Sequence, residues 1–169
     1  MKRRCWLLAA GGMTLLVGCA TTPRPDTIQP ALGRHNHWQG RFALRVDDGQ
    51  DQAFYAPFEL HGNMQEAWLR LYSPIGTVLA ELRWGPGGAQ LNRDGRIELY
   101  DSPESMSEAL LGTRIPFAAW FDWLDGIPTE APGWAVDLAD YPMGRLHAVR
   151  TDPQPSVDLR IILEDARSS

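Results

Sequence analysis

The residue near the start of the chain with the clearest chemistry is Cys19. Cationic residues 2–4 precede an apolar run from Trp6 to Val17, and small residues follow, which is the order found in a secretory signal. The segment Leu16–Cys19 places a thiol directly after a predicted cleavage point, where the sulfur can take a diacylglycerol before a peptidase cuts. We therefore predict that residues 1–18 are a signal peptide that is removed and that Cys19 carries covalent lipid.

A transmembrane anchor is the alternative interpretation of the apolar run. Its dozen residues would extend only about 18 Å as a helix, whereas the hydrocarbon core of a bilayer is about 30 Å thick. Two or more acyl chains on Cys19 would instead hold the protein stably on a membrane. Many enterobacterial lipoproteins kept at the inner membrane carry Asp after the cysteine, and this chain has Ala20. We therefore expect a lipid-anchored protein on the periplasmic face of the outer membrane.

Removal of residues 1–18 would leave 151 of the 169 residues, with 13 Lys and Arg against 21 Asp and Glu and a formal charge of −8. That length suits a single domain. The acidic balance argues against nucleic acid as a partner. No thiol would remain for a disulfide, a metal site or cysteine catalysis, because Cys5 leaves with the signal and the lipid consumes Cys19.

The sequence lacks the common catalytic motifs Gly-x-Ser-x-Gly, His-Glu-x-x-His and the phosphate-binding loop ending in Gly-Lys-Ser/Thr. Asp122 and Asp125 could act as an acid and a base, but they suit the solvated face of a helix better. The histidines are scattered; His35 and His37 could bind a metal weakly, but a histidine pair in a tether is more often solvated. We expect a protein that is not an enzyme, with no metal and no cofactor beyond the lipid on Cys19.

Ser73-Pro74-Ile75-Gly76 is a turn sequence with an unusual apolar member. An Ile at a tight turn has little room to bury its side chain in the strands that the turn connects. If exposed, it would gain roughly 1.5–3 kcal/mol on entering a bilayer, enough to orient a loop and too little to anchor a protein. Folding of Ile75 back onto the rim of the sheet is the alternative, and the residues alone favour it.

From Trp38 onward, apolar and polar residues alternate with the two-residue period of half-buried strands. Pro57 predicts an edge or a bulge, and Asp94-Gly95 suits a tight hairpin turn. Nine segments carry the strand pattern: residues 38–47, 54–60, 67–72, 77–84, 90–92, 96–100, 134–138, 146–150 and 157–163.

Two short helices are predicted between the sixth and seventh of these strands. Ser102 is the expected N-cap of the first, with Pro103 at its first position and Gly112 beyond its end. Pro116 begins the second, Gly126 ends it, and its apolar face is largely aromatic.

These elements predict a mainly β (α+β) fold: an open antiparallel half-barrel with a helical lid over an apolar cavity. The six tryptophans beyond residue 18 suit either a dense core or the walls of a cavity, and the sequence alone favours a core. Strand parity and helix periodicity give the candidate lining of that apolar cavity: Phe42, Leu44, Phe58, Leu71, Leu82, Trp84, Phe117, Trp120 and Phe121.

Six segments stand out by their order and spacing: Trp38–Leu44, Trp68–Gly76, Leu79–Leu82, Leu110–Gly112, Ile115–Phe117 and Trp123–Gly126. Together they resemble the LolB family, the outer-membrane lipoprotein receptors of the lipoprotein sorting pathway. The similarity covers the lipid-attachment sequence and most of residues 38–163, and it rests on the order and spacing of the segments together.

The resemblance implies a half-barrel that takes acylated lipoproteins from the periplasmic carrier LolA and inserts them into the outer membrane without making or breaking a bond. In the family, an exposed apolar residue in the loop matching Ser73–Gly76 promotes insertion, which gives that role to Ile75. The expected partners are LolA, acylated lipoprotein cargo and membrane lipid, and we expect a monomer.

The chain departs from the family pattern in one place. The family usually has another hairpin between the lid and the strand matching Trp134–Leu138, whereas here only Ile127–Gly133 connect them, which predicts a short far wall and a short or divergent member. Residues 19–36 contain Pro23, Pro25 and Pro30 and are predicted to be a tether, 37–165 the domain and 166–169 a tail.

Two other classes of function stay open. One is an envelope lipoprotein that binds another small apolar ligand or lipid. The other is a structural or assembly lipoprotein with a filled core.

Overall fold

The computed structural model describes residues 36–49 and 52–164, which lie in the second of two units of the chain, residues 34–169. The predicted signal peptide, Cys19, Ala20, residues 19–35 of the tether and the tail at 166–169 lie outside the described residues. The elements are β1 (His37–Asp47), β2 (Gln52–Gly62), β3 (Ala67–Tyr72), β4 (Val78–Gly85), β5 (Gly88–Arg93), β6 (Arg96–Tyr100), α1 (Pro103–Leu111), α2 (Phe117–Leu124), β7 (Trp134–Asp137), η1 (Tyr141–Met143), β8 (Arg145–Arg150) and β9 (Ser156–Leu163).

The strands form one antiparallel sheet in the order β6-β5-β4-β3-β2-β1-β9-β8-β7. β6 and β7 are the two edges and do not pair with each other, so the sheet is not closed into a barrel. The predicted fold, an open antiparallel half-barrel with helices, is therefore confirmed.

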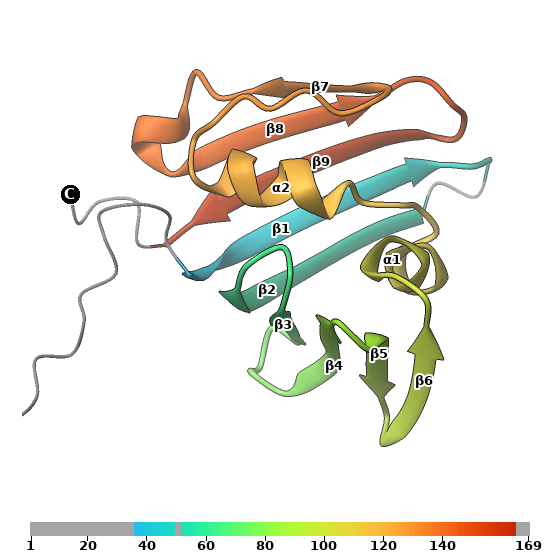
Figure 1. Cartoon of the computed structure of the whole chain (residues 1–169). Helices are drawn as coiled ribbons and strands as arrows, with labels where there is room; N and C mark the ends of the chain where they lie inside the picture. The colour runs from blue at the N-terminus through green and yellow to red at the C-terminus, as the bar shows by residue number, and fades with distance from the viewer. Residues whose placement is uncertain (1–35, 50–51, 165–169) are drawn as a thin grey trace, which may run out of the picture. The chain divides into compact units, whose positions relative to one another are not determined.

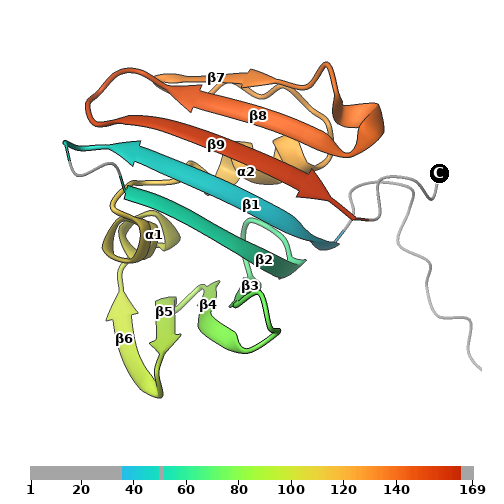
Figure 2. The same ribbon diagram turned by 180° about the vertical axis from the view of Figure 1, so that it is seen from behind.

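The path of the chain explains where the helices lie. β1 to β6 form one meander and β7 to β9 another, and β9 pairs with β1 in the middle of the sheet. The segment with α1 and α2 must therefore connect one edge of the sheet to the other. Figure 1 shows the face of the sheet that α2 covers, and Figure 2 shows the opposite face, with α2 behind β1 and β9. We call these the inner and the outer face.

Alternation along the strands decides which residues face the helices. In β1 the burial pattern alternates strictly, with Phe42, Leu44 and Val46 buried and the residues between them more exposed. Leu159 and Ile161 of β9 are buried in the same way. Because successive side chains point to opposite faces, these residues form an apolar inner face, as the sequence period predicts.

Pro57 was predicted to lie at a sheet edge or a bulge, and only this part of β2 lacks a neighbouring strand on one side. β2 lies inside the sheet and pairs with β1 at Pro57, but it pairs with β3 only from Phe58 to Gly62. Pro57 therefore has a neighbouring strand on one side only, where its missing N–H costs no ladder hydrogen bond. The irregularity in the ladder lies instead between Leu71 and Tyr72 of β3.

Both predicted helices form, and their ends follow local chemistry. The hydroxyl of Ser102 accepts a hydrogen bond from the backbone N–H of Ser105 (3.1 Å), and Gly112 ends α1 in the left-handed conformation with φ 73°. α2 begins at Phe117, one residue later than predicted, because Pro116 is its N-cap. Within residues 36–49 and 52–164, no helix has the length and apolar content needed to cross a membrane.

Gly40 allows β1 and β9 to approach closely, and this generates a stability prediction. A Cβ at position 40 would overlap the backbone carbonyl oxygen of Ile162. We expect Gly40→Ala to lower the free energy of unfolding by about 1–3 kcal/mol, as for other overpacked interiors. The measurement is the midpoint of urea unfolding at unchanged slope. Gly87→Ala is the control, because nothing lies within 4 Å of a Cβ there; equal midpoints for the two variants would contradict the prediction.

Candidate functional site

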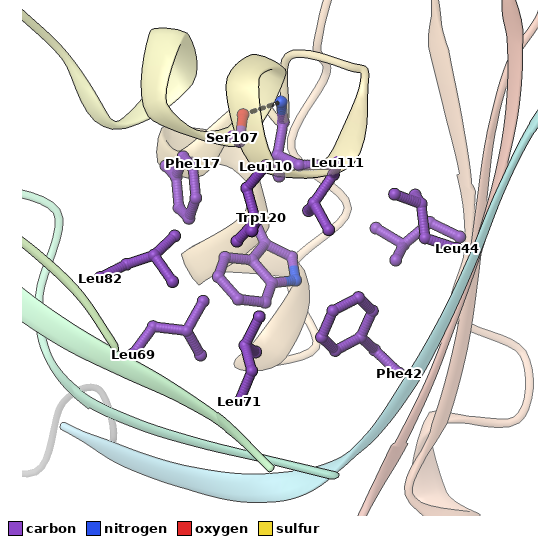
Figure 3. A pocket seen from close by; sticks show the side chains of 12 residues that line it. Phe42, Leu44, Leu69, Leu71, Leu82, Ser107, Leu110, Leu111, Phe117 and Trp120 are labelled. Atoms are coloured by element: carbon purple, nitrogen blue, oxygen red, sulfur yellow. Dashed lines mark hydrogen bonds between the residues drawn. The ribbon is translucent and has the colours of Figure 1, made fainter. Parts of the chain in front are cut away.

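An apolar cavity lies between the inner face of the sheet and the two helices (Figure 3). Strands β1, β3, β4 and β9 form its floor, and α1, α2 and the segment between the helices cover it. The lining residues are Phe42, Leu44, Leu69, Leu71, Leu82, Ser107, Leu110, Leu111, Ile115, Phe117, Trp120 and Leu159.

The cavity is small. Its volume, counted as the space open to the centre of a water-sized sphere, is about 20 Å³. A site needs roughly 10–15 Å³ by that measure to hold one water molecule. The side chains therefore fill most of the interior in this conformation, and an acyl chain can enter only if one wall moves.

Six of the nine residues predicted to line an acyl-chain cavity surround this space: Phe42, Leu44, Leu71, Leu82, Phe117 and Trp120. The other three, Phe58, Trp84 and Phe121, are buried in the same core but do not line the cavity. Their rings pack against the rings that do, so they support its wall from behind.

Aromatic contacts fasten α2 to the sheet. Phe117 of α2 lies 5.0 Å from Trp84 of β4 between ring centroids, and Phe121 lies 5.4 Å from Trp38 of β1. Phe58 of β2 lies 6.3 Å from Trp120. Such pairs contribute about 0.5–1.5 kcal/mol each beyond the area they bury. α2 is therefore a fixed wall of the cavity.

Hydrogen bonds also fix the end of α2. The indole N–H of Trp123 donates to the carbonyl of Thr129 (2.8 Å), and the hydroxyl of Tyr141 donates to the carbonyl of Leu124 (2.9 Å). Burial, together with the nearby carboxylate of Asp125, raises the pKa of Tyr141 and keeps this donor protonated. Asp122 accepts a hydrogen bond from the hydroxyl of Thr129 (2.6 Å), so this carboxylate fastens the connection after α2.

α1 is held less tightly than α2. Only Met106 and Ser107 of α1 are buried, and Leu110 and Leu111 cover the cavity while partly exposed. The sequence predicted a lid of two helices, but the covering residues it named all came from the second helix, and these two leucines were missed. The two consecutive leucines at the end of this short helix could have indicated that α1 also covers the cavity.

Four other lining residues also escaped sequence analysis. Leu69 shares the parity of Leu71 along β3, and Leu159 shares the inner face of β9, so strand alternation could have found both. Ile115 and Ser107 carry no such periodic signal, because their positions depend on how the segment between the helices folds.

The hydroxyl of Ser107 is the polar group at the top of the cavity, and it is fully engaged. It accepts a hydrogen bond from the backbone N–H of Ile115 (3.0 Å), drawn as a dashed line in Figure 3. Its own hydrogen faces the carbonyls of Glu104 (2.8 Å) and Thr113 (3.1 Å). Ser107 therefore ties α1 to the segment that leads into α2.

Trp120 brings an unsatisfied donor to the cavity wall. Figure 3 shows its ring at the centre of the lining residues, between leucines of the sheet and leucines of α1. Its indole N–H is buried and has no hydrogen-bond partner among the described residues. A buried donor without a partner loses about 1–3 kcal/mol relative to water, so a ligand with an acceptor here would recover part of that loss.

The turn at Ser73–Gly76 presents Ile75 to solvent. The backbone N–H of Ser73 donates to the carbonyl of Thr77 (2.8 Å), and the N–H of Gly76, at φ 83°, donates to the carbonyl of Ser73 (2.9 Å). Ile75 at the tip is 89% exposed. Folding back onto the rim, which the residues alone favoured, is wrong, because the tight turn points this side chain away from the sheet.

The short connection after α2 leads directly into β7. β7 is an edge strand and pairs only with β8. The lining residues on this side of the sheet come from β9, which supplies Leu159.

Comparisons with known proteins give one consistent result. The family model described as Outer membrane lipoprotein LolB matches residues 35–158. A Bordetella petrii protein named Outer-membrane lipoprotein LolB is 30% identical over 94% of this chain and 90% of its own. A protein of that name from Cupriavidus pinatubonensis is 32% identical over 89% of this chain and 73% of its own. Another from Sodalis glossinidius is 31% identical over 72% of this chain and 59% of its own.

The alignment with the Bordetella petrii protein extends over 185 positions, more than the 169 residues of this chain, so that relative has residues with no counterpart here. The matched region nevertheless contains all of β1 to β8 and most of the cavity lining. On the strength of these matches, the chain belongs to the LolB family of outer-membrane lipoproteins.

Proposed function

We propose that this protein accepts acylated lipoproteins from the carrier LolA and inserts them into the outer membrane without a covalent step. The observation that carries the proposal is the apolar cavity beneath α1 and α2, whose lining is aliphatic or aromatic except for the engaged hydroxyl of Ser107. Family membership supports it, since the relatives carry the name of outer-membrane lipoproteins. In this proposal Cys19 carries the lipid that anchors the protein on the periplasmic face.

The energetics suit one-way transfer. Each methylene of an acyl chain that leaves water gains about 0.8 kcal/mol, so affinity depends on how much apolar surface the opened cavity offers. A receptor site that binds the chains slightly better than the carrier does shifts the cargo forward without ATP. Release then requires only that the bilayer offer a still better environment.

α1 is the wall that we propose moves. Rings fasten α2 on both sides, whereas α1 buries little beyond Met106 and Ser107. Lifting α1 would remove Leu110 and Leu111 from the top of the cavity. The space that opens above Leu69, Leu71 and Trp120 could then hold an aliphatic chain.

The unsatisfied donor of Trp120 supports a ligand that carries a carbonyl group. Acyl chains are attached to lipoproteins through esters and an amide, whose carbonyl oxygens accept hydrogen bonds. A plain hydrocarbon ligand would leave the indole N–H without a partner.

A structural lipoprotein with a filled interior is the second candidate, and the small cavity volume favours it. An apolar fluorescent dye separates the two. A receptor whose α1 opens should bind the dye and release it when acylated lipoprotein is added, whereas a filled core should give no enhancement. Native mass spectrometry would identify any other apolar ligand by its mass.

A first prediction concerns acceptance of cargo. Proteoliposomes with the full-length protein should take lipoprotein from an acylated LolA complex, and Leu71→Phe should reduce this uptake. Leu71 is 1% exposed at the cavity floor, so three extra ring carbons would occupy space meant for the ligand. Displacing about two methylenes costs about 1.6 kcal/mol, which corresponds to about tenfold. Leu99→Phe is the matched control, since Leu99 is 80% exposed; equal uptake by both variants would argue against the cavity as the binding site.

A second prediction separates delivery from acceptance. Ile75→Glu should leave uptake unchanged and slow the movement of cargo into protein-free liposomes about tenfold, because the turn loses the 1.5–3 kcal/mol available to an aliphatic side chain in a bilayer. Ile162→Glu is the control: Ile162 is another exposed isoleucine, at 50%, but β1 and β2 separate its strand from β3. Normal delivery by Ile75→Glu would refute this account of the turn.

A third prediction concerns the moving wall. Amide hydrogen exchange in the protein without ligand should be faster along α1 than along α2, because few buried contacts hold α1. Ser107→Ala should raise exchange in α1 and at Ile115 further, since it removes the acceptor of the Ile115 N–H. Equal protection of the two helices would contradict the assignment of α1.

A further inference from the structure

Three side chains with metal-binding groups meet on the outer face of the sheet, away from the cavity. The sequence placed His37 beside His35, but the strand register pairs His37 of β1 with His61 of β2 instead. Glu59 lies two residues before His61 and therefore points to the same face. One ligand atom from each of the three residues lies within 4.8 Å of the others.

We propose that His37, Glu59 and His61 form a site for a divalent transition-metal ion of the zinc class. Tetrahedral bonds of about 2.0–2.2 Å place two ligand atoms about 3.4 Å apart. Glu59 Oε1 lies 2.9 Å from His61 Nε2 and 3.6 Å from His37 Nε2, on either side of that value. The stacked rings of His37 and His61 would have to rotate so that both imidazole lone pairs aim at the ion, and solvent would complete its coordination.

The surroundings orient the ligands as a second shell does. The hydroxyl of Tyr72 donates to Glu59 Oε2 (2.9 Å), which leaves Oε1 to face the imidazoles. The ring of His61 is stacked between those of His37 and Trp68, with centroids 4.0 and 4.2 Å away.

The charges near the cluster permit a cation. Arg70 lies over the ring of Trp68 (4.5 Å), but its guanidinium is paired with Glu81 (2.6 Å). The carboxylate of Glu59 faces the imidazoles of His61 and His37. Two nitrogen ligands and one oxygen ligand favour Zn²⁺, Cu²⁺ or Ni²⁺ over Mg²⁺ or Ca²⁺, which prefer oxygen.

His147 and Asp158, on neighbouring strands of the same sheet, provide a matched comparison. They lie 3.0 Å apart and are about as exposed as the proposed ligands, but Arg160 binds the same carboxylate (3.0 Å). This pair offers two ligand groups and has the guanidinium of Arg160 as a competing cation, whereas the proposed site offers three ligand groups. It should therefore not hold the ion.

The test is a calorimetric titration of the full-length protein with ZnCl₂ after alkylation of its thiols with iodoacetamide. We expect one equivalent to bind, with affinity lowered at least tenfold in His37→Gln, Glu59→Gln and His61→Gln and unchanged in His147→Gln and His35→Gln. Tyr72→Phe should lower affinity about tenfold, because loss of an outer-shell hydrogen bond typically costs 10–100-fold. MgCl₂ should give no heat of binding.

Melting temperatures without metal distinguish a lost site from a lost fold. Zn²⁺ should raise the melting temperature of the wild-type protein and of His147→Gln, and not that of His61→Gln. The proposal is overturned if His37→Gln and His61→Gln bind like the wild type. It is also overturned if His147→Gln or His35→Gln loses as much affinity as they do.

Discussion

An open sheet with an apolar inner face has to be covered, and the rest of this structure depends on that constraint. Closing the sheet would bury the face, but β6 and β7 stand at opposite edges and do not pair. The chain buries the face by carrying α1 and α2 from one edge to the other. The same segment therefore completes the fold and forms the roof of the cavity.

The two helices divide that task unequally. α2 brings Phe117, Trp120 and Phe121 against rings of the sheet, and the hydroxyl of Tyr141 closes its C-terminal end. α1 packs against β4, β5 and β6 but buries only Met106 and Ser107, and the hydroxyl of Ser107 ties it to the segment before α2. A roof with one fixed part and one lightly held part can open without loss of the core, because the aromatic contacts lie on the part that stays.

Local patterns predicted most of the fold. Alternation gave the inner faces of β1 and β9, and the signals at Ser102 and Gly112 gave the ends of α1, because each depends on neighbours in sequence. The exposure of Ile75 followed only from the family resemblance, since a turn sequence does not say which way its tip points. The meeting of His37 with His61 was not predictable, because it depends on the register between β1 and β2.

The small volume of the closed cavity bears on how a receptor could release what it binds. If opening α1 costs free energy, only a fraction of molecules is competent to bind, and the apparent affinity falls by that fraction. A permanently open apolar cavity would hold acyl chains more tightly and would expose leucines to water in the absence of cargo. Collapse of Leu110 and Leu111 onto Trp120 would compete with the chains for the same space. Under the proposed function, the packing that fills the empty cavity would therefore favour departure of the cargo as well, once a bilayer lies within reach.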